Sequence, residues 1–476
     1  MVIWDTVRRD RMSVYGHANR TTPFVEEWSR GARVYENCVS AGSTTVPAHA
    51  SIFTGLLPYQ HGADNQRPRL SDDFSTLAEL LKAAGYATYA FTANPHVSAD
   101  TNLTQGFDLT EHPWSPRFID DAVRITREKI PPEDESTELA EKIRSDARLV
   151  EWNVKTAGGL AQRGVFDWLQ SRTDGRPYFV LLNYMEAHRP LIPPRSYRER
   201  FMSDEQVARS YKVDRRWVPM WAYTFGLREY TPEEVELTAL TYDAALAELD
   251  DLFRDLLEAL RGAGRLDNTV VVLLSDHGEH LGDHHMFDHQ FSVYNELLYV
   301  PLIVSAPGRL PVGREARPVM NMDLFPTLLE IAGAKPPPGL PTLAVSLLAP
   351  QEARARVAEY PDFDPRPWQR ALRAYYHEPH KLIVASDQRH ELYDLANDPR
   401  EQRNLLHAEP ETARRLHEEF EQLIESLDRG KSGDGPLSPE YLRRLEGLGY
   451  AGGTDDAGAA ETRPASGPAS SPSRRP

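Results

Sequence analysis

The feature that most constrains the fold is a set of short, continuously apolar runs, most of which end close to acidic residues and histidines. They are residues 1–4 before Asp5, residues 178–183 before Glu186 and His188, residues 270–274 before Asp276 and His277, and residues 300–305. Apolar runs without alternation are typical of parallel strands that are covered on both faces of a sheet. Helical patterns at residues 75–85 and 237–260 lie between them. The sequence therefore predicts an α/β fold in which helices sandwich a mostly parallel sheet.

The polar residues that follow these runs are expected to meet. In open α/β sheets, ligands bind beyond the carboxyl ends of the strands. A lone acid or histidine at such a position is more often structural, but several of them at one edge of one sheet predict a site. The residues concerned are Asp5, Glu186, His188, Asp276 and His277.

The chain of 476 residues is long enough for one large domain and one smaller domain. A helix is predicted to begin near Asp323, which would cap it, and to end at Gly333. Prolines then cluster at residues 336–341, and the character of the sequence changes. We therefore predict a large domain over residues 1–345 and a smaller α+β domain over residues 346–453.

The smaller domain is predicted from three strand-like runs and a charged helix. The runs lie near residues 372–376, 381–385 and 391–394, and the helix spans residues 410–427. Residues 454–476 are rich in Ala, Gly, Ser and Pro, so they cannot bury enough apolar surface to offset the entropy of ordering. We expect a disordered tail there.

Charge limits the classes of partner. The chain has a formal net charge of -17 and a pI near 5.5. A protein that binds nucleic acid needs a basic face that displaces counterions, so nucleic acid is not expected as a partner. An anionic substrate would need local positive charge, and a divalent metal ion is the simplest source of it in an acidic protein.

Cys38 is the single cysteine, which excludes an intrachain disulfide and a site built from several thiolates. The sequence contains no run of about 18 or more apolar residues, so no transmembrane helix is predicted. The first residues do not resemble a secretory signal, so the chain as written is expected in the cytoplasm. Export is the alternative if residues are missing upstream, because the first apolar run is short for a strand.

Residues 43–55 contain the candidate nucleophile. Pro47 suits the first position of a helix, because its φ is fixed and its missing N–H needs no partner there. Thr45 would then lie just ahead of a helix N-terminus, where free N–H groups and the helix dipole favour negative charge. A hydroxyl at that position can ionise more easily and can lie beside an anionic ester. The alternative is a plain helix cap, since Ser and Thr often precede helices only to cap them.

Residues 275–279 contain the candidate metal ligands. Asp276 and His277 place a carboxylate beside an imidazole, and both groups bind divalent metals of borderline hardness. Gly278 would let the backbone approach closely. The alternative is a helix cap next to an unrelated histidine. Further histidines follow and favour a metal site, although not all can be ligands: His280, His284, His285 and His289.

In their order along the chain, these segments resemble the sulfatase family of the alkaline-phosphatase superfamily. The similar segments include DTVRRD at residues 5–10, TVPAHASIFTG at 45–55, PYQHG at 58–62, NYMEAHRP at 183–190, SDHGEHLG at 275–282, residues 289–294 and 300–304, and the C-terminal residues 391–399, 404–405 and 448–450. The resemblance covers nearly the whole chain. It implies a large, mixed, mostly parallel sheet sandwiched by helices, with a smaller α+β C-terminal domain, and it makes residues 1–345 the catalytic domain.

The resemblance also implies a metal site and a substrate site. Asp5, Asp276, His277 and the Oγ of Thr45 would bind a divalent metal ion. His49 would orient the nucleophile or the substrate.

His188 and His289 would face the anionic group or the leaving oxygen of the substrate, or help to hold a second metal. Glu186 would bind substrate beside them. The expected catalytic residues are Thr45, His49, His188 and His289.

Two residues depart from the family pattern. Sulfatases need Cys or Ser at the position of Thr45, because that residue is oxidised to a formylglycine aldehyde, and threonine cannot become an aldehyde. A plain threonine alkoxide instead resembles the phosphodiesterases and phosphotransferases of the superfamily. Thr6 stands where a calcium-binding sulfatase usually offers another carboxylate, so zinc or manganese is favoured and calcium stays an alternative.

We therefore predict a metal-dependent hydrolase that acts on a phosphate (di)ester, phosphonate or sulfate ester through Thr45. The substrate would be a small-molecule, glycan or lipid ester that carries negative charge. Three alternatives stay open: a phosphotransferase that uses an acceptor alcohol, a sulfatase that uses unmodified Thr45, and a non-catalytic scaffold with the same fold.

Overall fold

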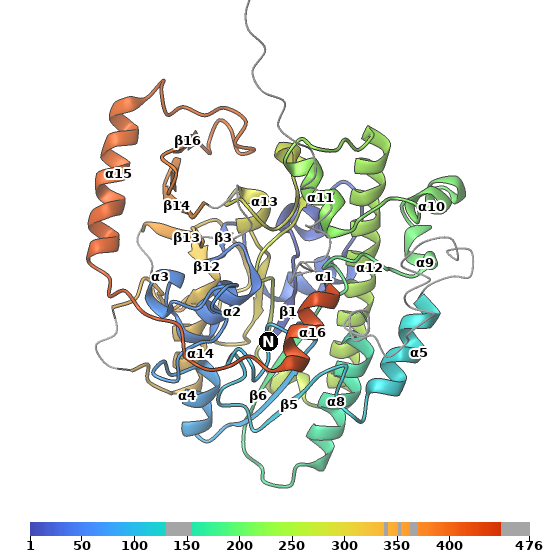
Figure 1. The fold of residues 1–476 in the computed structure, drawn as a ribbon. Helices are drawn as coiled ribbons and strands as arrows, with labels where there is room; N and C mark the ends of the chain where they lie inside the picture. Colours follow the sequence, from blue (N-terminus) through green and yellow to red (C-terminus); the bar gives the residue numbers. More distant parts are fainter. Residues whose placement is uncertain (130–154, 156, 338–340, 351–353, 362–369, 449–476) are drawn as a thin grey trace, which may run out of the picture.

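The computed structural model describes residues 1–129, 155, 157–337, 341–350, 354–361 and 370–448. Its main element is an eight-stranded sheet with the order β11-β2-β10-β7-β1-β6-β4-β5. Helices cover both faces of this sheet, and a second, four-stranded sheet lies to one side (Figure 1). The predicted α/β class with a smaller C-terminal part is confirmed. The strands are β1 Val2–Trp4, β2 Arg33–Tyr35, β4 Ala87–Thr92, β5 Leu109–Glu111, β6 Tyr178–Tyr184, β7 Val271–Leu274, β10 Leu302–Ser305 and β11 Gly313–Glu315.

The central strands run in the same direction. β1 pairs in parallel with β6 and β7, and β4 pairs in parallel with β6 and β5. β10, which corresponds to the predicted run 300–305, is buried but antiparallel to both β7 and β2. A continuous apolar run reports burial on both faces and carries no information on direction, so the sequence pattern did not separate β10 from its parallel neighbours.

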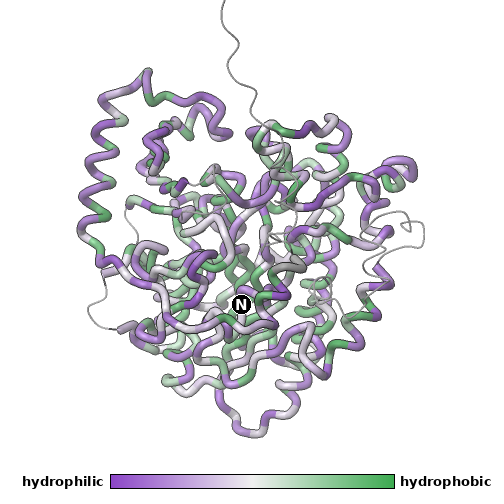
Figure 2. The backbone as a smooth tube through the Cα atoms, viewed as in Figure 1, coloured by the Kyte–Doolittle hydropathy of each residue, from purple (hydrophilic) through white to green (hydrophobic). Residues whose placement is uncertain are grey.

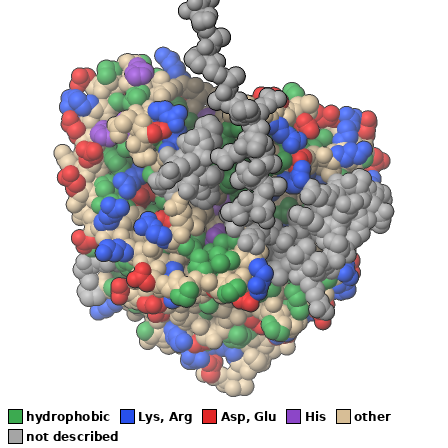
Figure 3. Space-filling model, in the orientation of Figure 1, with side chains coloured by type: hydrophobic (Ala, Val, Ile, Leu, Met, Phe, Trp, Pro, Cys, Tyr) green, Lys and Arg blue, Asp and Glu red, His purple; other side chains and the backbone are tan. Residues whose placement is uncertain are grey.

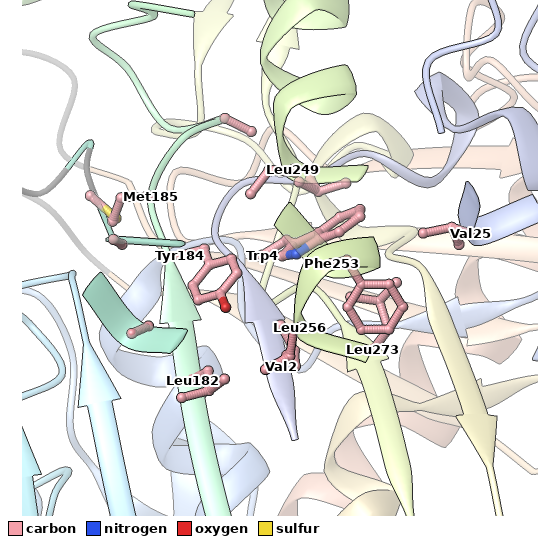
Figure 4. Close-up of a cluster of buried hydrophobic side chains, with 14 of the residues drawn as sticks. Val2, Trp4, Val25, Leu182, Tyr184, Met185, Leu249, Phe253, Leu256 and Leu273 are labelled. Carbon is pink, nitrogen blue, oxygen red and sulfur yellow. The ribbon is translucent and has the colours of Figure 1, made fainter. Parts of the chain in front are cut away.

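Side chains of β1 alternate between two apolar layers. Val2 and Trp4 lie in one hydrophobic cluster and Ile3 lies in the other. Figure 4 shows Trp4 directed from β1 toward Phe253 on α12. The layer of Trp4 contains α1 Pro23–Trp28, α8 Ala157–Ser171 and α12 Pro232–Gly262, and the opposite side carries α2 Thr45–Thr54, α4 Leu77–Ala83 and α14 Leu324–Ala332.

The long helix α12 begins five residues before the predicted pattern at 237–260, because the start signal lies outside the apolar periodicity. Thr231 accepts a hydrogen bond from Glu234 N at 3.2 Å, and the Glu234 carboxylate accepts one from Thr231 N at 2.8 Å. Pro232 stands at the first helical position. This capping box satisfies backbone donors that the first turn cannot pair internally.

The helix predicted near Asp323 is α14, and it ends at Gly333 as expected. Asp323 does not cap it, because its carboxylate accepts hydrogen bonds from Met320 N at 2.9 Å and Val345 N at 3.0 Å. The carboxylate therefore caps the short turn that precedes α14 and attaches the chain that follows the proline cluster.

The smaller sheet is antiparallel and consists of β13 Arg356–Tyr360, β14 Leu372–His377, β15 His380–Ala385 and β16 Glu391–Asp394. The last three match the predicted runs, and β13 is an addition. α15 Pro410–Glu425 packs on this sheet, and α16 Pro439–Leu448 follows. Met320 and Met322 of the large domain share one cluster with Val357 and Phe420. The boundary at residues 345/346 stays a prediction, and residues 454–476 lie outside the described residues.

The sequence patterns missed several strands of the large sheet. β4 is the most important, because all six of its residues, ATYAFT, are buried and it lies between β6 and β5. Its threonines, tyrosine and alanines do not form a continuous run of aliphatic residues. Thr, Tyr and Phe nevertheless favour strands, so β-propensity was the signal that could have identified it.

The remaining elements surround these layers. They are α3 Pro58–His61, α5 Ile119–Lys129, α9 Arg195–Arg198, α10 Asp204–Ser210, α11 Trp217–Thr224 and α13 Asn295–Leu298, with the strand pairs β3 Cys38–Val39 and β12 Val319–Met320, and β8 His280–Leu281 and β9 Phe287–Asp288. Hydrophobic residues concentrate in the middle of the molecule, and outer helices such as α10 and α15 are largely hydrophilic (Figure 2). On the face seen in Figure 3, side chains of both charges are interspersed. No helix in the described ranges combines the length and the apolar composition that crossing a bilayer requires.

Phe253 is the centre of an aromatic group that joins α12 to β1 and α1. Its ring lies 5.9 Å from that of Trp4 and 5.0 Å from that of Trp28, and the side chain is fully buried. We predict that Phe253→Ala lowers the free energy of unfolding by about 3–5 kcal/mol, because a cavity replaces the ring. Urea denaturation followed by tryptophan fluorescence measures this change. Leu227→Ala, at a side chain that is 78% exposed, is the control and should change it by less than about 0.5 kcal/mol.

Candidate active site

Thr45 is the first residue of α2, and it is fully buried. The prediction that it precedes a helix starting at Pro47 was wrong by two residues, since Pro47 is the third residue of the helix. Proline fits there because the first N–H groups of a helix have no internal partner. Thr44 is the N-cap residue, and its hydroxyl makes no capping hydrogen bond. Thr45 therefore still lies at the helix end where the dipole favours negative charge.

The carboxyl ends of the central strands meet as predicted. Asp5 N donates to Tyr184 O at 2.9 Å, which joins the ends of β1 and β6. Thr6 N donates to Asp276 Oδ1 at 3.2 Å, and Val7 N donates to Ser275 Oγ at 2.8 Å, which join the ends of β1 and β7. Parallel pairing thus brings residues more than 250 positions apart into one hydrogen-bonded group.

The Thr45 hydroxyl lies inside this group. Its Oγ1 is 3.4 Å from His277 Nε2. Asn94 Nδ2 donates to Thr45 Oγ1 at 3.3 Å and to Asp5 Oδ2 at 2.9 Å. One amide therefore bridges the threonine hydroxyl and the first carboxylate. Asn183 Nδ2 is a second donor to the same carboxylate oxygen, at 3.3 Å.

Asp5, Asp276 and His277 form a group that fits a divalent metal ion. Each offers one ligand atom, and these atoms lie within 4.8 Å of one another. Within the described part of the chain, Asp5 Oδ1 and Asp276 Oδ2 accept no hydrogen bond although both are buried. Burial, with Asp276 nearby, raises the pKa of Asp5 to about 6, and burial raises the pKa of Asp276 to about 7. A bound cation would remove the cost of these two charges.

His49 connects α2 to the same carboxylates. Its Nδ1 is 3.0 Å from Thr45 O and 3.4 Å from Asp276 Oδ2. Burial lowers the pKa of His49 to about 3, so the imidazole is neutral and Nδ1–H donates to the carbonyl. The structure thus places His49 where it can hold the first turn of α2 in position.

His289 lies beside the metal-type group and carries positive charge. Its ring centroid is 4.6 Å from that of His277, and its Nδ1 is 2.9 Å from Asp288 Oδ1 and 3.6 Å from Glu279 Oε2. Burial alone would lower the pKa of His289, but Asp288 and Glu279 outweigh burial and raise it to about 10. Arg189 Nη2 lies 3.5 Å from Asp288 Oδ2. Without a metal ion, these two cations face the two carboxylates. Glu279, Asp288 and His289 also each offer a ligand atom within 4.8 Å of one another, so this group could hold a second metal ion, as the resemblance implies for His289.

His188 lies beside His289, with ring centroids 5.2 Å apart. Lys155 Nζ donates to the backbone oxygens of Met185 and His188. Burial, together with Lys155, holds the pKa of His188 well below its ordinary value, so this imidazole is neutral. Lys155 was not predicted, because no strand end or motif marks it in the sequence.

Glu186 takes part in a different contact from the other candidates. Its Oε1 accepts a hydrogen bond from Gly158 N at 3.0 Å, at the beginning of α8. A carboxylate suits a helix N-terminus, so this contact is sufficient to explain the residue. Its role toward a substrate stays a prediction.

Two further residues of the site follow the strand that the sequence patterns missed. Asn94 and His96 lie in the loop after β4, and both are buried. His96 N donates to Asn94 Oδ1 at 2.9 Å, so His96 lies next to the amide that bridges Asp5 and Thr45. The run of strand-forming residues before Asn94-Pro95 was the signal that could have located this loop.

The fold and the site define a class of α/β protein in which a hydroxyl, two carboxylates and several histidines converge at the carboxyl edge of a mixed sheet. Residues 1–334 match the family model described as Sulfatase, and residues 282–428 match the model described as N-sulphoglucosamine sulphohydrolase, C-terminal. The chain therefore belongs to the sulfatase family of the alkaline-phosphatase superfamily, and it is an ester hydrolase of that family.

Relatives with known names are distant in sequence. An N-acetylglucosamine-6-O-sulfatase of Bacteroides thetaiotaomicron is 24% identical, over 89% of this chain and 85% of its own length. An arylsulfatase of Clostridium perfringens is 23% identical, over 86% of this chain and 90% of its own. Among solved structures, a phosphonate monoester hydrolase of Agrobacterium radiobacter superposes with a TM-score of 0.68 at 21% identity, over 89% of this chain and 94% of its own. This structural neighbour shares the fold.

The group around Asp5 predicts a measurable effect of metal ions on stability. We expect Zn²⁺ or Mn²⁺ to raise the thermal midpoint of metal-stripped protein, because an ion at about 100 times its Kd adds about 2.7 kcal/mol to the native state. Asp5→Asn should abolish most of this rise. Differential scanning fluorimetry, with metal analysis of dialysed protein, measures it.

Asp250→Asn is the matched control, because Asp250 is a buried carboxylate that caps α1 through Phe24 N and Val25 N, both at 2.8 Å. This variant should lose basal stability and keep the metal-induced rise. An equal rise in Asp5→Asn and in the parent would remove Asp5 from the ligand set.

Proposed function

We propose that this protein is a metal-dependent hydrolase of phosphate monoesters or diesters, phosphonate esters or sulfate esters, with the Thr45 hydroxyl as its nucleophile. One observation carries the proposal: Thr45 Oγ1, at the start of α2, touches His277 and Asn94 within the group formed with Asp5 and Asp276. A hydroxyl that only capped the helix would not need these neighbours.

Asp5, Asp276 and His277 would hold the metal ion, with Thr45 Oγ1 as a further ligand. When bound, the ion would act as a Lewis acid that favours the ionised form of the Thr45 hydroxyl and neutralises negative charge on the substrate. The chain contributes to the same effect. Asn94 donates an N–H to Thr45 Oγ1, and the N-terminal end of α2 favours negative charge at its first residue.

The reaction would proceed in two displacements. Thr45 Oγ forms a bond to phosphorus or sulfur while the bond from that centre to the leaving oxygen breaks. Water then attacks the same centre and releases Thr45. The His289 imidazolium, held between Asp288 and Glu279, is the charged group best placed to bind the anionic oxygens. His188, beside it, is a neutral imidazole, so it would accept the proton that the Thr45 hydroxyl loses and return it to the leaving oxygen. In the second displacement it would accept a proton from the attacking water and return it to Thr45 Oγ.

Thr45 favours phosphoryl-type centres over sulfate. A threonine cannot be converted to the formylglycine aldehyde, so the hydroxyl itself must attack. Phosphonate monoester hydrolases of Agrobacterium radiobacter and Silicibacter pomeroyi share the fold, but so does a protein solved with a sulfated sugar, at the same TM-score of 0.68 as the first of them, so the preference rests on the threonine. The sulfatase relatives keep sulfate esters within the proposal, and their names suggest an anionic sugar ester as one natural substrate.

Zinc or manganese suits the donor set better than calcium. Calcium takes about 6–8 oxygen ligands, whereas this group offers two carboxylates, one hydroxyl and one imidazole nitrogen. Thr6 supplies no carboxylate, and its buried hydroxyl makes no hydrogen bond within the described residues. An imidazole in the inner shell is typical of zinc and other transition metals.

Thr45→Ala should abolish turnover, whereas Thr45→Ser should keep a measurable fraction because it retains the attacking oxygen. The assay compares aryl phosphodiesters, aryl phosphonates and aryl sulfates, each with zinc, manganese and calcium. Loss of a covalent nucleophile typically costs several orders of magnitude in kcat, about 10⁶ where it has been measured. Turnover by Thr45→Ala equal to that of the parent would refute the proposal.

Thr44→Ala is the matched control. It removes an equally buried threonine hydroxyl, one residue earlier, that makes no capping contact. Its activity should stay close to that of the parent. Cleavage of sulfate esters alone by the parent would leave the nucleophile in place and overturn the preference for phosphoryl centres.

A further inference from the structure

The segment after α15 returns to the large domain and ends beside the site. Residues 429–438 cross from the end of α15 to α16, which lies in front of the large sheet (Figure 1). Gly430 N donates to Tyr59 O at 3.1 Å, and Gly433 N donates to Arg69 O at 2.8 Å. Ser438 N then donates to Asp100 Oδ1 at 3.0 Å.

This segment fits the large domain at the level of the backbone. A Cβ atom at Gly430 would lie 1.6 Å from Gln60 O, and a Cβ atom at Gly433 would lie 2.8 Å from Leu70 O. Side chains cannot be accommodated at such distances, so the two glycines allow the close approach. The path from α15 to α16 is therefore specific and not a loose connection.

α16 presents one fully buried side chain to the loop after β4. Tyr441 Oη lies 2.8 Å from His96 Nδ1, and the rings meet edge to face with centroids 5.9 Å apart. Arg444 adds a second contact on the same helix, with its guanidinium 4.8 Å from the ring of Trp114. The loop that α16 supports carries Asn94, the residue that bridges Asp5 and Thr45.

We propose that Tyr441 is a positioning residue of the active site: its hydroxyl donates to His96 Nδ1 and so holds this imidazole as an Nε2–H donor beside the substrate's anionic group. The proposal rests on the proposed function only for the identity of the substrate. Neither family model extends to α16, since they end at residues 334 and 428. These models therefore describe no role for α16.

Donation from the tyrosine follows from the surroundings of the pair. Burial lowers the pKa of His96 to about 3, so the ring is neutral and has one acceptor nitrogen. If Nδ1–H donated instead, the buried tyrosine proton would need another acceptor, and within the described residues His96 is its hydrogen-bond partner. A buried donor without an acceptor costs about 1–3 kcal/mol. The favoured state therefore leaves the ring proton on Nε2.

Position and tautomer matter here because His96 N donates to Asn94 Oδ1 at 2.9 Å, and Asn94 bridges Asp5 and Thr45. His289, His49 and His277 interact electrostatically with His96. With its proton on Nε2, the neutral ring adds one hydrogen-bond donor from the loop after β4. Rotation of the ring, or a change of tautomer, would replace that donor by a lone pair that repels an anionic oxygen.

Tyr441→Phe tests the proposal by removing one hydroxyl. We expect kcat for the best ester substrate to fall about 10-fold with little change in KM, as for other residues that orient a ligand side chain. In a His96→Gln background, Tyr441→Phe should cause no further loss, because the hydroxyl acts through His96. Additive losses in the double variant would overturn the proposal.

A second measurement does not depend on activity. The ¹⁵N chemical shifts of histidine-labelled zinc protein report which ring nitrogen carries the proton, and His96→Gln assigns the signal. We expect Nε2–H in the parent and a mixture of tautomers in Tyr441→Phe. Nδ1–H in the parent, or an unchanged signal in the variant, would refute the role of Tyr441 even if no tested ester were hydrolysed.

Tyr89→Phe is the matched control. Tyr89 is equally buried and donates its hydroxyl to Glu111 Oε2 at 2.7 Å, so the variant loses a buried hydrogen bond that does not involve the site. It should keep the parent's kcat and the parent's His96 signal. A loss in Tyr89→Phe as large as that in Tyr441→Phe would assign the effect to general destabilisation and overturn the proposal.

Discussion

The site depends on the burial of two negative charges at one edge of the sheet. Asp5 follows β1 and Asp276 follows β7, and parallel pairing of these strands brings the two carboxylates together. Removing a charge from water costs several kcal/mol unless an opposite charge compensates. Hydrogen bonds from Asn94 and from the backbone of Thr6 compensate in part, but one oxygen of each carboxylate still lacks a donor in the described ranges. A divalent cation would satisfy both oxygens, so the same ion would stabilise this edge of the sheet and serve the proposed chemistry.

The C-terminal part of the chain helps to build the site, although its own elements carry none of the proposed ligands. In its sheet, Lys381 forms a fully buried ion pair with Glu401 at 2.6 Å, and the same carboxylate accepts Asn295 N at 2.7 Å. These contacts attach the segment that follows His289. α16 contacts the loop after β4 through Tyr441 and His96. The shared apolar cluster packs the two parts of the chain against each other.

Part of the site could be predicted because its residues follow sequence patterns that identify buried strands. Asp5, Asp276 and His277 stand at the ends of apolar runs. Such runs are typical of strands that are buried on both faces, so the strand ends could be located. Asn94 and His96 were missed because β4 mixes threonine and tyrosine with alanine, and no acid follows it. Lys155 has no local signal, since its partners are backbone oxygens of a loop about 30 residues away. The direction of β10 was equally invisible, because burial does not depend on direction.

The sequence by itself determined the α/β class, the buried central strands and the presence of acids and histidines at their ends, because local patterns of polarity decide which segments can lie in a covered sheet. Because threonine cannot become an aldehyde, Thr45 also predicted, without any coordinates, that a nucleophile at this position would attack through its own hydroxyl. Only the tertiary structure decided which polar groups share an electrostatic environment. It placed Arg189 and His289 against Asp288, turned Glu186 toward α8 and brought Tyr441 to His96. Such choices depend on distances between segments far apart in the chain, and no local pattern encodes those distances.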